Sequence, residues 1–212
     1  MTRTRQIPRS EAPESVLPIY DRLFGNRDPV SEPGTATGTP GNWWTVFAQT
    51  PPLLEHMVSG FALFNDPKRT LAPDLRELAL TRVGFAAASQ FVFSQHCKAA
   101  RNAGLSEEKV AAIPAWSVAE VYSPGERAVL AYTDDLVMAD GRVQDATYAA
   151  LREELNETAI IELTYAVAMY KLHATMCRAL RLEFDDVDER IVEIAAPADG
   201  DQDVMGTISM QD

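Results

Sequence analysis

The sequence predicts an all-α fold. Almost every segment between residues 43 and 182 begins or ends with residues that start or stop helices. No segment alternates apolar and polar residues with the period of two that a half-buried strand requires. Residues 158–182 are apolar almost all round, which is typical of a helix buried at the centre of a fold.

Helices are expected along most of the chain, joined by short turns. Pro73 has the place of a first-turn proline, Gly104 is typical of a residue that ends a helix, and Asp145 is a candidate helix cap. Ser123 and Glu126 form a capping box, the clearest helix start in the chain. The expected helices cover residues 16–24, 43–49, 53–64, 73–88, 90–104, 107–113, 124–139, 145–154 and 158–182.

The two ends of the chain differ in composition from its middle. The first sixteen residues are polar, and residues 26–42 contain three glycines, three prolines and three threonines. Such segments bury too little apolar surface to offset the entropy lost on ordering. We therefore expect a flexible arm and loop over residues 1–42, a helical domain over 43–195 and a flexible acidic tail over 196–212.

The charge balance narrows the classes of partner. The chain has 19 Lys and Arg against 31 Asp and Glu, a formal net charge of −12. Nucleic acids and anionic membranes favour a basic face, and no apolar run approaches the roughly 20 residues that cross a bilayer. The N-terminus lacks a secretory signal, and two cysteines are typical of a reducing compartment. We expect a soluble cytoplasmic protein that binds neither nucleic acid nor membrane.

Glu77 and His96 are the candidate acid–base residues. Each lies on a helix face whose other residues are small or apolar, so a neighbouring helix can approach closely. A buried carboxylate beside an imidazole can exchange protons with a substrate. The two faces consist of Glu77, Thr81, Gly84 and Ala88, and of Val92, His96, Ala99 and Ala103.

Structural alternatives remain open for both residues. Glu77 can stabilise the first turn of its helix, through the helix dipole or a capping box with Asp74. His96 can be a core histidine bonded to a backbone carbonyl. In a simple hairpin that turns near Ser89, the two side chains are offset by roughly 7–8 Å along the helix axes. A direct contact then requires a crossing angle, a kink near Gly84 or a bridging water.

The remaining candidates carry weaker signals. Trp43 and Trp44 can line a pocket, or pack in the core or at a subunit interface. Cys97 and Cys177 are expected to act as small hydrophobic residues, and His173 is expected to be structural. The three histidines lack the spacing of metal ligands, and no glycine-rich nucleotide loop is present.

The residues around Glu77 and His96 resemble those of a known superfamily. Residues 75–83 read LRELALTRV, residues 89–96 read SQFVFSQH and residues 103–106 read AGLS. The carboxymuconolactone decarboxylase and alkylhydroperoxidase D-like superfamily has an Arg-Glu-Leu helix start, an Arg five residues after the Glu and a His nineteen residues after it. Glu77, Arg82 and His96 match this pattern. The resemblance covers about residues 40–185 and is most specific between Glu77 and His96.

This resemblance implies an alkylhydroperoxidase D-like helical bundle. On the decarboxylase branch it implies a cofactor-independent lyase for a small cyclic acid or lactone. His96 would carry the proton, Glu77 would orient His96, and Arg82 would neutralise an anionic group or tether Glu77. The superfamily assembles as closed rings, so we expect a homo-oligomer, with a trimer favoured over a dimer or hexamer. The apolar walls of the substrate site would be Phe91, Phe93, Trp43 and Trp44.

The sequence departs from both branches of the superfamily. Where the hydroperoxidase branch has a Cys-x-x-Cys pair, this chain has Ser89 and Val92, which cannot form a thiolate. Where the decarboxylase branch has Tyr-Glu-Trp, it has Phe91, Val92 and Phe93. The loss of a hydroxyl and a carboxyl there indicates a substrate less polar than the lactone that names the branch.

Two other functions therefore remain open. One is a thiol-dependent peroxidase that uses Cys97 or Cys177. The other is a non-catalytic binding protein on the same fold, because folds recruit unrelated functions readily. Two short matches, Arg76-Glu77-Leu78 and Ile161-Glu162-Leu163, also suggest an internally duplicated helical unit.

Overall fold

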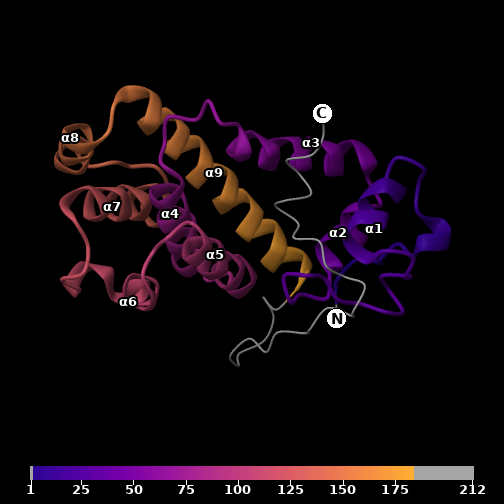
Figure 1. Ribbon diagram of the computed structural model, residues 1–212. Coiled ribbons are helices and arrows are strands. Elements are labelled where there is room, and N and C mark those ends of the chain that lie inside the picture. The colour runs from indigo at the N-terminus through magenta and orange to yellow at the C-terminus, as the bar shows by residue number, and fades with distance from the viewer. Residues whose placement is uncertain (1, 184–212) are drawn as a thin grey trace. The chain divides into compact units, whose positions relative to one another are not determined.

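The computed structural model describes residues 2–183, which form two compact units (Figure 1). The described part of the first unit comprises residues 2–68 and 180–183, and the second unit comprises residues 69–179. Residues 2–183 contain helices and turns and no strand, so the predicted all-α class is confirmed. None of their helices is both long and apolar enough to cross a membrane. The expected tail over 196–212 lies outside the described residues.

The first unit is built around aromatic side chains. The indole ring of Trp43 packs against the rings of Trp44 and Phe47 at 4.7 Å each and of Phe61 at 5.7 Å. Residues 180–183 join this unit because Glu183 Oε1 accepts a hydrogen bond of 2.9 Å from Trp43 N. Its helices are η1 (Arg9–Glu11), α1 (Leu17–Phe24), α2 (Asn42–Phe47), α3 (Pro51–Ala62) and η2 (Leu63–Asn65).

The N-terminal 42 residues, expected as a flexible arm and loop, make several polar contacts with one another and with the backbone. Arg9 donates to Asp21 Oδ1 and to the backbone oxygens of Gly25 and Arg27, so one guanidinium ties the arm to the end of α1. In the loop, Thr35 is fully buried and its hydroxyl bonds that of Thr39 at 2.9 Å. These polar groups bond one another and the backbone. The expectation of flexibility considered only the apolar surface that the segment can bury, and so left such hydrogen bonds out.

The second unit contains the segment with Glu77 and His96. Its helices begin close to the predicted residues, and the Ser123–Glu126 capping box is present. The cap of α8 is Gln144 and not Asp145, which is instead the first helical residue. The helices are α4 (Pro73–Ala86), α5 (Gln90–Asn102), α6 (Glu107–Ala112), η3 (Ile113–Val118), α7 (Pro124–Met138), α8 (Asp145–Glu154) and α9 (Glu157–Leu180).

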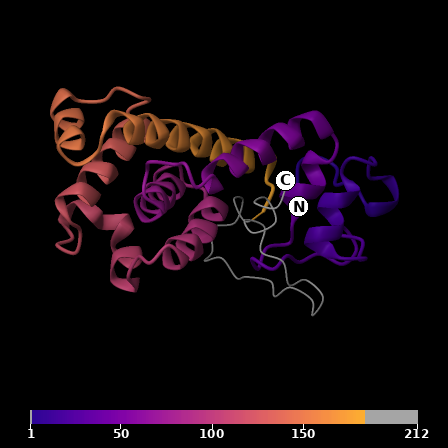
Figure 2. The same ribbon diagram turned by 45° about the horizontal axis from the view of Figure 1, so that its top comes forward.

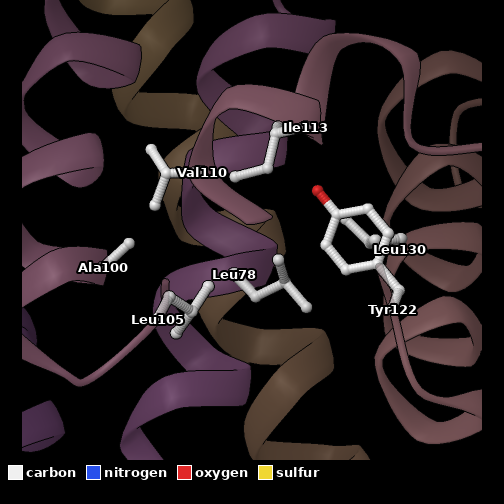
Figure 3. Close-up of a cluster of buried hydrophobic side chains, with 7 residues drawn as sticks. All are labelled: Leu78, Ala100, Leu105, Val110, Ile113, Tyr122 and Leu130. Carbon is white, nitrogen blue, oxygen red and sulfur yellow. The ribbon is translucent and has the colours of Figure 1, made fainter. Parts of the chain in front are cut away.

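A buried apolar cluster connects several of these helices. It lies on one side of α4 and α5, where Leu78 and Ala100 face the residues that follow α5 (Figure 3). Phe93, Cys97 and Trp116 are partly buried against it. The cluster consists of Leu78, Ala100, Leu105, Val110, Ile113, Tyr122 and Leu130.

The turn between α4 and α5 is a Schellman motif. Ser89 N donates to Gly84 O at 2.9 Å, Ala88 N donates to Phe85 O at 3.0 Å, and Ala88 has a φ of 52°. The same pattern ends α5 at Gly104, where φ is 98°. Because alanine rarely adopts this conformation, the sequence signals the end of α5 but not that of α4, which was expected to reach residue 88.

Gly84 permits α4 and α5 to cross at backbone contact. A Cβ added at Gly84 would lie 2.4 Å from Phe93 N and 2.6 Å from Phe93 Cα. Glu77 lies two turns before Gly84 on the same face of α4, and His96 lies one turn after Val92 on the same face of α5. The crossing therefore directs both side chains toward the same region.

Helix α9 lies along the α4–α5 pair in both views (Figures 1 and 2). Its inward face includes Leu163, Val167 and Tyr170, which are at most 5% exposed. The expectation that this helix is buried all round is wrong for its other face, where Ile161 is 69% and Leu172 is 59% exposed. An apolar sequence does not show whether each face has a neighbour within the same chain.

The Gly84→Ala substitution tests the helix crossing. The added methyl group would overlap the backbone of α5, which cannot move as a side chain can, so we expect a loss of about 3 kcal/mol in the free energy of unfolding. Urea denaturation followed by circular dichroism measures this loss. Gly125→Ala is the matched control, since its methyl group would meet only the flexible side chain of Glu154 at 3.0 Å. Equal midpoints for the two variants would contradict the crossing.

Candidate active site

Glu77 and His96 form a direct and buried hydrogen bond. His96 Nδ1 lies 2.8 Å from Glu77 Oε2. His96 is 7% exposed and Glu77 is 4% exposed. The carboxylate therefore holds one ring nitrogen, and the other, Nε2, is the nitrogen that can exchange a proton with a bound molecule. The sequence allowed a crossing angle, a kink or a bridging water to overcome the axial offset between the two side chains. The structure has the crossing, at Gly84. The capping box of Glu77 with Asp74 is absent: the N-cap of α4 is Ala72, and Glu77 bonds across to α5.

Arg76 is the cation at Glu77. Its Nε donates to Glu77 Oε1 at 3.0 Å, so the two carboxylate oxygens bond two different partners. Burial alone would raise the pKa of Glu77, but the hydrogen bond and charge of His96 and the charge of Arg76 outweigh it and hold the pKa below its usual range. Glu77 is therefore a carboxylate at neutral pH.

Helix α9 supplies Tyr170 and His173 to the same region. The Tyr170 ring stands edge-on to that of His96 at 88°, with ring centroids 4.4 Å apart. His173 packs against Tyr170 at 5.7 Å and against Phe91 of α5 at 6.1 Å. Burial, followed by the charge of His96, lowers the pKa of His173 to about 3, so this imidazole is neutral at pH 7.

Arg82 is not part of this group, although the resemblance pairs it with Glu77. Its Nε and Nη2 bond the carboxylate of Asp134 at 2.6 and 2.9 Å, and its Nη1 donates to the backbone oxygens of Ile113 and Pro114. Trp116 Nε1 completes the network with a bond of 2.9 Å to Asp134. Arg82 therefore connects α4, η3 and α7, and a turn of roughly 140° along the helix separates it from Glu77.

The four aromatic residues predicted to line the site lie in three places. Phe91 contacts His173. Phe93 faces the apolar cluster of Figure 3 and packs against Phe85 at 5.9 Å. Trp43 and Trp44 lie in the first unit and pack against each other. Of the four, Phe91 is the one in ring contact with His173, which lies beside the Glu77–His96 pair. The role of the two tryptophans stays a prediction.

Sequence reasoning missed three residues of this group. In the sequence, Arg76 stands out only as part of the motif, Tyr170 only as part of a helix, and His173 only as a structural residue. One signal was available: Tyr170 and His173 are three residues apart, so they share a face of an otherwise apolar helix. Among residues 2–183, no three His, Cys, Asp or Glu side chains are grouped closely enough to hold a metal ion.

Comparisons with known proteins show what the chain is similar to in sequence and in fold. Residues 52–135 match the model of the Carboxymuconolactone decarboxylase family. The predicted resemblance to the carboxymuconolactone decarboxylase and alkylhydroperoxidase D-like superfamily is confirmed over these residues, which include Glu77 and His96. The uncharacterized protein YdfG of Bacillus subtilis (strain 168) is 29% identical over 93 residues, which are 43% of this chain and 63% of that protein. The matched region is thus less than two thirds of that relative's length.

Solved structures of the superfamily's fold resemble the chain over most of its length. The debrominase Bmp8, as a variant in complex with 2,3,4-tribromopyrrole, has a TM-score of 0.63 at 19% identity and covers 84% of this chain and 90% of its own. A peroxidase-related protein from Ralstonia eutropha JMP134 with an alkylhydroperoxidase AhpD core has a TM-score of 0.56 at 17% identity, covering 84% and 93%. At these identities the likeness shows the fold.

The two cysteines of the chain lie in packed surroundings. Cys97 lies next to His96 in sequence, but it packs against the apolar cluster. Burial raises the pKa of the Cys97 thiol to about 11, so very little thiolate forms at neutral pH. Cys177 is fully buried on α9.

The buried neutral imidazole of His173 predicts acid sensitivity. Its folded-state pKa of about 3 lies below the usual value of 6.5, so protonation of the unfolded chain removes stability as pH falls from about 6.5 toward 3. The expected slope is about 1.4 kcal/mol per pH unit. Urea titrations between pH 6.5 and 5.5, above the usual pKa of 4.5 near which protonation of Glu77 in the unfolded chain begins to lower stability, measure it.

His173→Gln should flatten this slope, because the glutamine side chain does not titrate. His56→Gln, at an exposed histidine of the first unit, should leave the slope as in the wild type. A wild-type slope in the His173→Gln variant would contradict the assignment.

Proposed function

We propose that this protein is a cofactor-independent lyase, similar to the decarboxylase branch of its superfamily, that acts on a small cyclic acid or lactone by acid–base chemistry. The observation that carries the proposal is the buried hydrogen bond of 2.8 Å between His96 Nδ1 and Glu77 Oε2. A carboxylate that holds Nδ1 orients the ring and stabilises the imidazolium. The reacting atom is then Nε2 of His96.

The proton carrier suits the loss of carbon dioxide from a substrate with a conjugated carbonyl. The bond between the ring carbon and the carboxylate breaks, carbon dioxide leaves, and the electron pair remains as an enolate. The imidazolium of His96 then gives its Nε2 proton to that carbon, and water returns a proton to Nε2. The Glu77 carboxylate stabilises the imidazolium before this transfer and is not itself consumed.

Arg76 replaces Arg82 in this proposal. The guanidinium of Arg82 is already engaged elsewhere. Its Nε and Nη2 bond Asp134, and its Nη1 bonds the backbone oxygen of Ile113 in η3. Arg76 lies against the carboxylate of Glu77 and adds a fixed positive charge beside the pair. Such a charge favours an anionic substrate over a neutral one.

Two observations support a small cyclic substrate whose ring is largely apolar. The aromatic ring of Tyr170 packs against His96, and the ring of Phe91 packs against His173, the next neighbour of Tyr170. The debrominase Bmp8, which shares the fold, is solved with 2,3,4-tribromopyrrole, a small ring compound. A thiol-dependent peroxidase has no comparable support, because Cys97 has a raised pKa and Cys177 is fully buried.

A panel of small cyclic carboxylic acids and carboxylated lactones tests the proposed reaction. NMR in deuterated water follows the loss of carbon dioxide and the deuterium that enters at the same carbon. We expect His96→Gln and Glu77→Gln to lower kcat on a responsive substrate, by about a hundredfold or more for His96→Gln, because general acid–base catalysis is lost. His56→Gln is the control and should keep wild-type turnover.

Two results would contradict the proposal. Undiminished turnover by His96→Gln would remove the proposed proton carrier. Binding of panel compounds without turnover would favour the non-catalytic binding protein.

A homo-oligomer is also part of the proposal, with a trimer favoured. The exposed apolar residues on the outer face of α9 support it, since water-exposed apolar stripes of this kind are typical of subunit interfaces. Ile161, Tyr165 and Leu172 are 69%, 47% and 59% exposed and lie on one face of the helix.

Light scattering on the eluted protein measures the assembly. We expect the wild type to elute above the 23.3 kDa of one chain, and Leu172→Glu to reduce the mass, because a buried unpaired carboxylate opposes association. Glu120→Gln, at an exposed residue that follows η3, is the control. A wild type of 23.3 kDa at all concentrations would contradict the oligomer.

A further inference from the structure

We infer that Tyr170 is the positioning residue of the Glu77–His96 pair: its ring prevents the His96 imidazole from turning, and so keeps Nδ1 on Glu77. The meaning of this inference for catalysis rests on the proposed function. The contact itself does not.

A single hydrogen bond leaves an imidazole incompletely fixed. The bond to Glu77 restrains the Nδ1 edge, but rotation about the Cβ–Cγ bond can exchange Nδ1 for a carbon of the ring. The Tyr170 ring stands at 88° to the imidazole with centroids only 4.4 Å apart, so that rotation would bring the two rings into collision. Two contacts in different directions, one polar and one steric, then define a single orientation.

Tyr170 is itself held in place. It is 5% exposed, and its ring packs against His173 at 5.7 Å. The ring of His173 packs in turn against Phe91 at 6.1 Å. Tyr170 on α9 is thus held through His173 by Phe91, which lies on α5. The ring that restrains His96 is therefore packed against the same helix that carries His96.

The neighbours of His96 on α9 add no competing charge. Burial, followed by the negative charge of Glu77, raises the pKa of Tyr170 and keeps its phenol protonated. His173 is neutral at pH 7. Tyr170 and His173 are therefore neutral rings beside the pair. The charged groups at the pair are those of Glu77, Arg76 and His96.

NMR on the full chain labelled with ¹⁵N at histidine tests the inference without a substrate. The readout is the exchange rate of the His96 Nδ1 proton with water, because each opening of the bond to Glu77 exposes that proton. Tyr170→Leu should raise this rate at least about tenfold, since the ring no longer blocks the rotation. Tyr170→Phe keeps the ring and should keep the wild-type rate.

Tyr132→Leu is the matched control. Tyr132 is also 5% exposed, lies on α7 and bonds Thr164, so its loss creates a comparable cavity beside Thr164. This variant should keep the wild-type exchange rate. Tyr170→Met serves in place of Tyr170→Leu if the latter does not fold. In the wild type, a nuclear Overhauser effect between the ring protons of Tyr170 and His96 is expected.

Several results would overturn the inference. These are a wild-type rate in a folded Tyr170→Leu or Tyr170→Met variant, an equal increase in Tyr132→Leu, and an equal increase in Tyr170→Phe. Absence of the Overhauser effect would do the same. The inference and the proposed function fail separately: turnover that survives His96→Gln removes the lyase, and an unchanged exchange rate removes only the role of Tyr170.

Discussion

The second unit depends on the backbone contact between α4 and α5 at Gly84. A residue with a side chain there would meet the amide nitrogen of Phe93 at 2.4 Å. Because the helices meet at this point, a carboxylate two turns away on one helix reaches an imidazole one turn away on the other. The Schellman turn at Ala88 and the N-cap at Ser89 set the direction in which α5 leaves that turn. Tight packing and the polar pair are thus two results of one close approach.

That approach also determines the electrostatics of the pair. Burial alone would raise the pKa of Glu77, yet its two oxygens have two donors, Arg76 on its own helix and His96 on the next. A buried carboxylate keeps its charge only when such partners compensate for lost water. His173, buried nearby on α9 and with a low pKa, stays neutral. The crossing of α4 and α5 thus places a carboxylate at the imidazole of His96, the one from which the proposed proton transfer starts.

Local signals predicted much of this fold, and non-local contacts account for what they missed. Proline at the start of α4, glycine at the end of α5 and the capping box at Ser123 act within one turn, so neighbouring residues in the sequence reveal them. The end of α4 was missed because Ala88 adopts a backbone conformation that its side chain does not signal. Spacing on two small-residue faces predicted Glu77 and His96 as candidates, whereas Arg82 matched a motif but pairs with Asp134, 52 positions along the chain. Tyr170 and His173 join from α9; their spacing shows that they share a face, but it does not show that this face meets α5.

The same crossing explains how the Glu77–His96 pair can exist without the cysteines of the hydroperoxidase branch. Those cysteines correspond to Ser89 and Val92, which begin α5 and are 1% and 2% exposed. Ser89 caps the helix through its hydroxyl, and Val92 lies at the backbone contact with Gly84. Both residues thus serve the packing that brings α5 to α4. The hydrogen bond between Glu77 and His96 requires that packing and no sulfur, so the proton transfer proposed above does not depend on a thiol at either position.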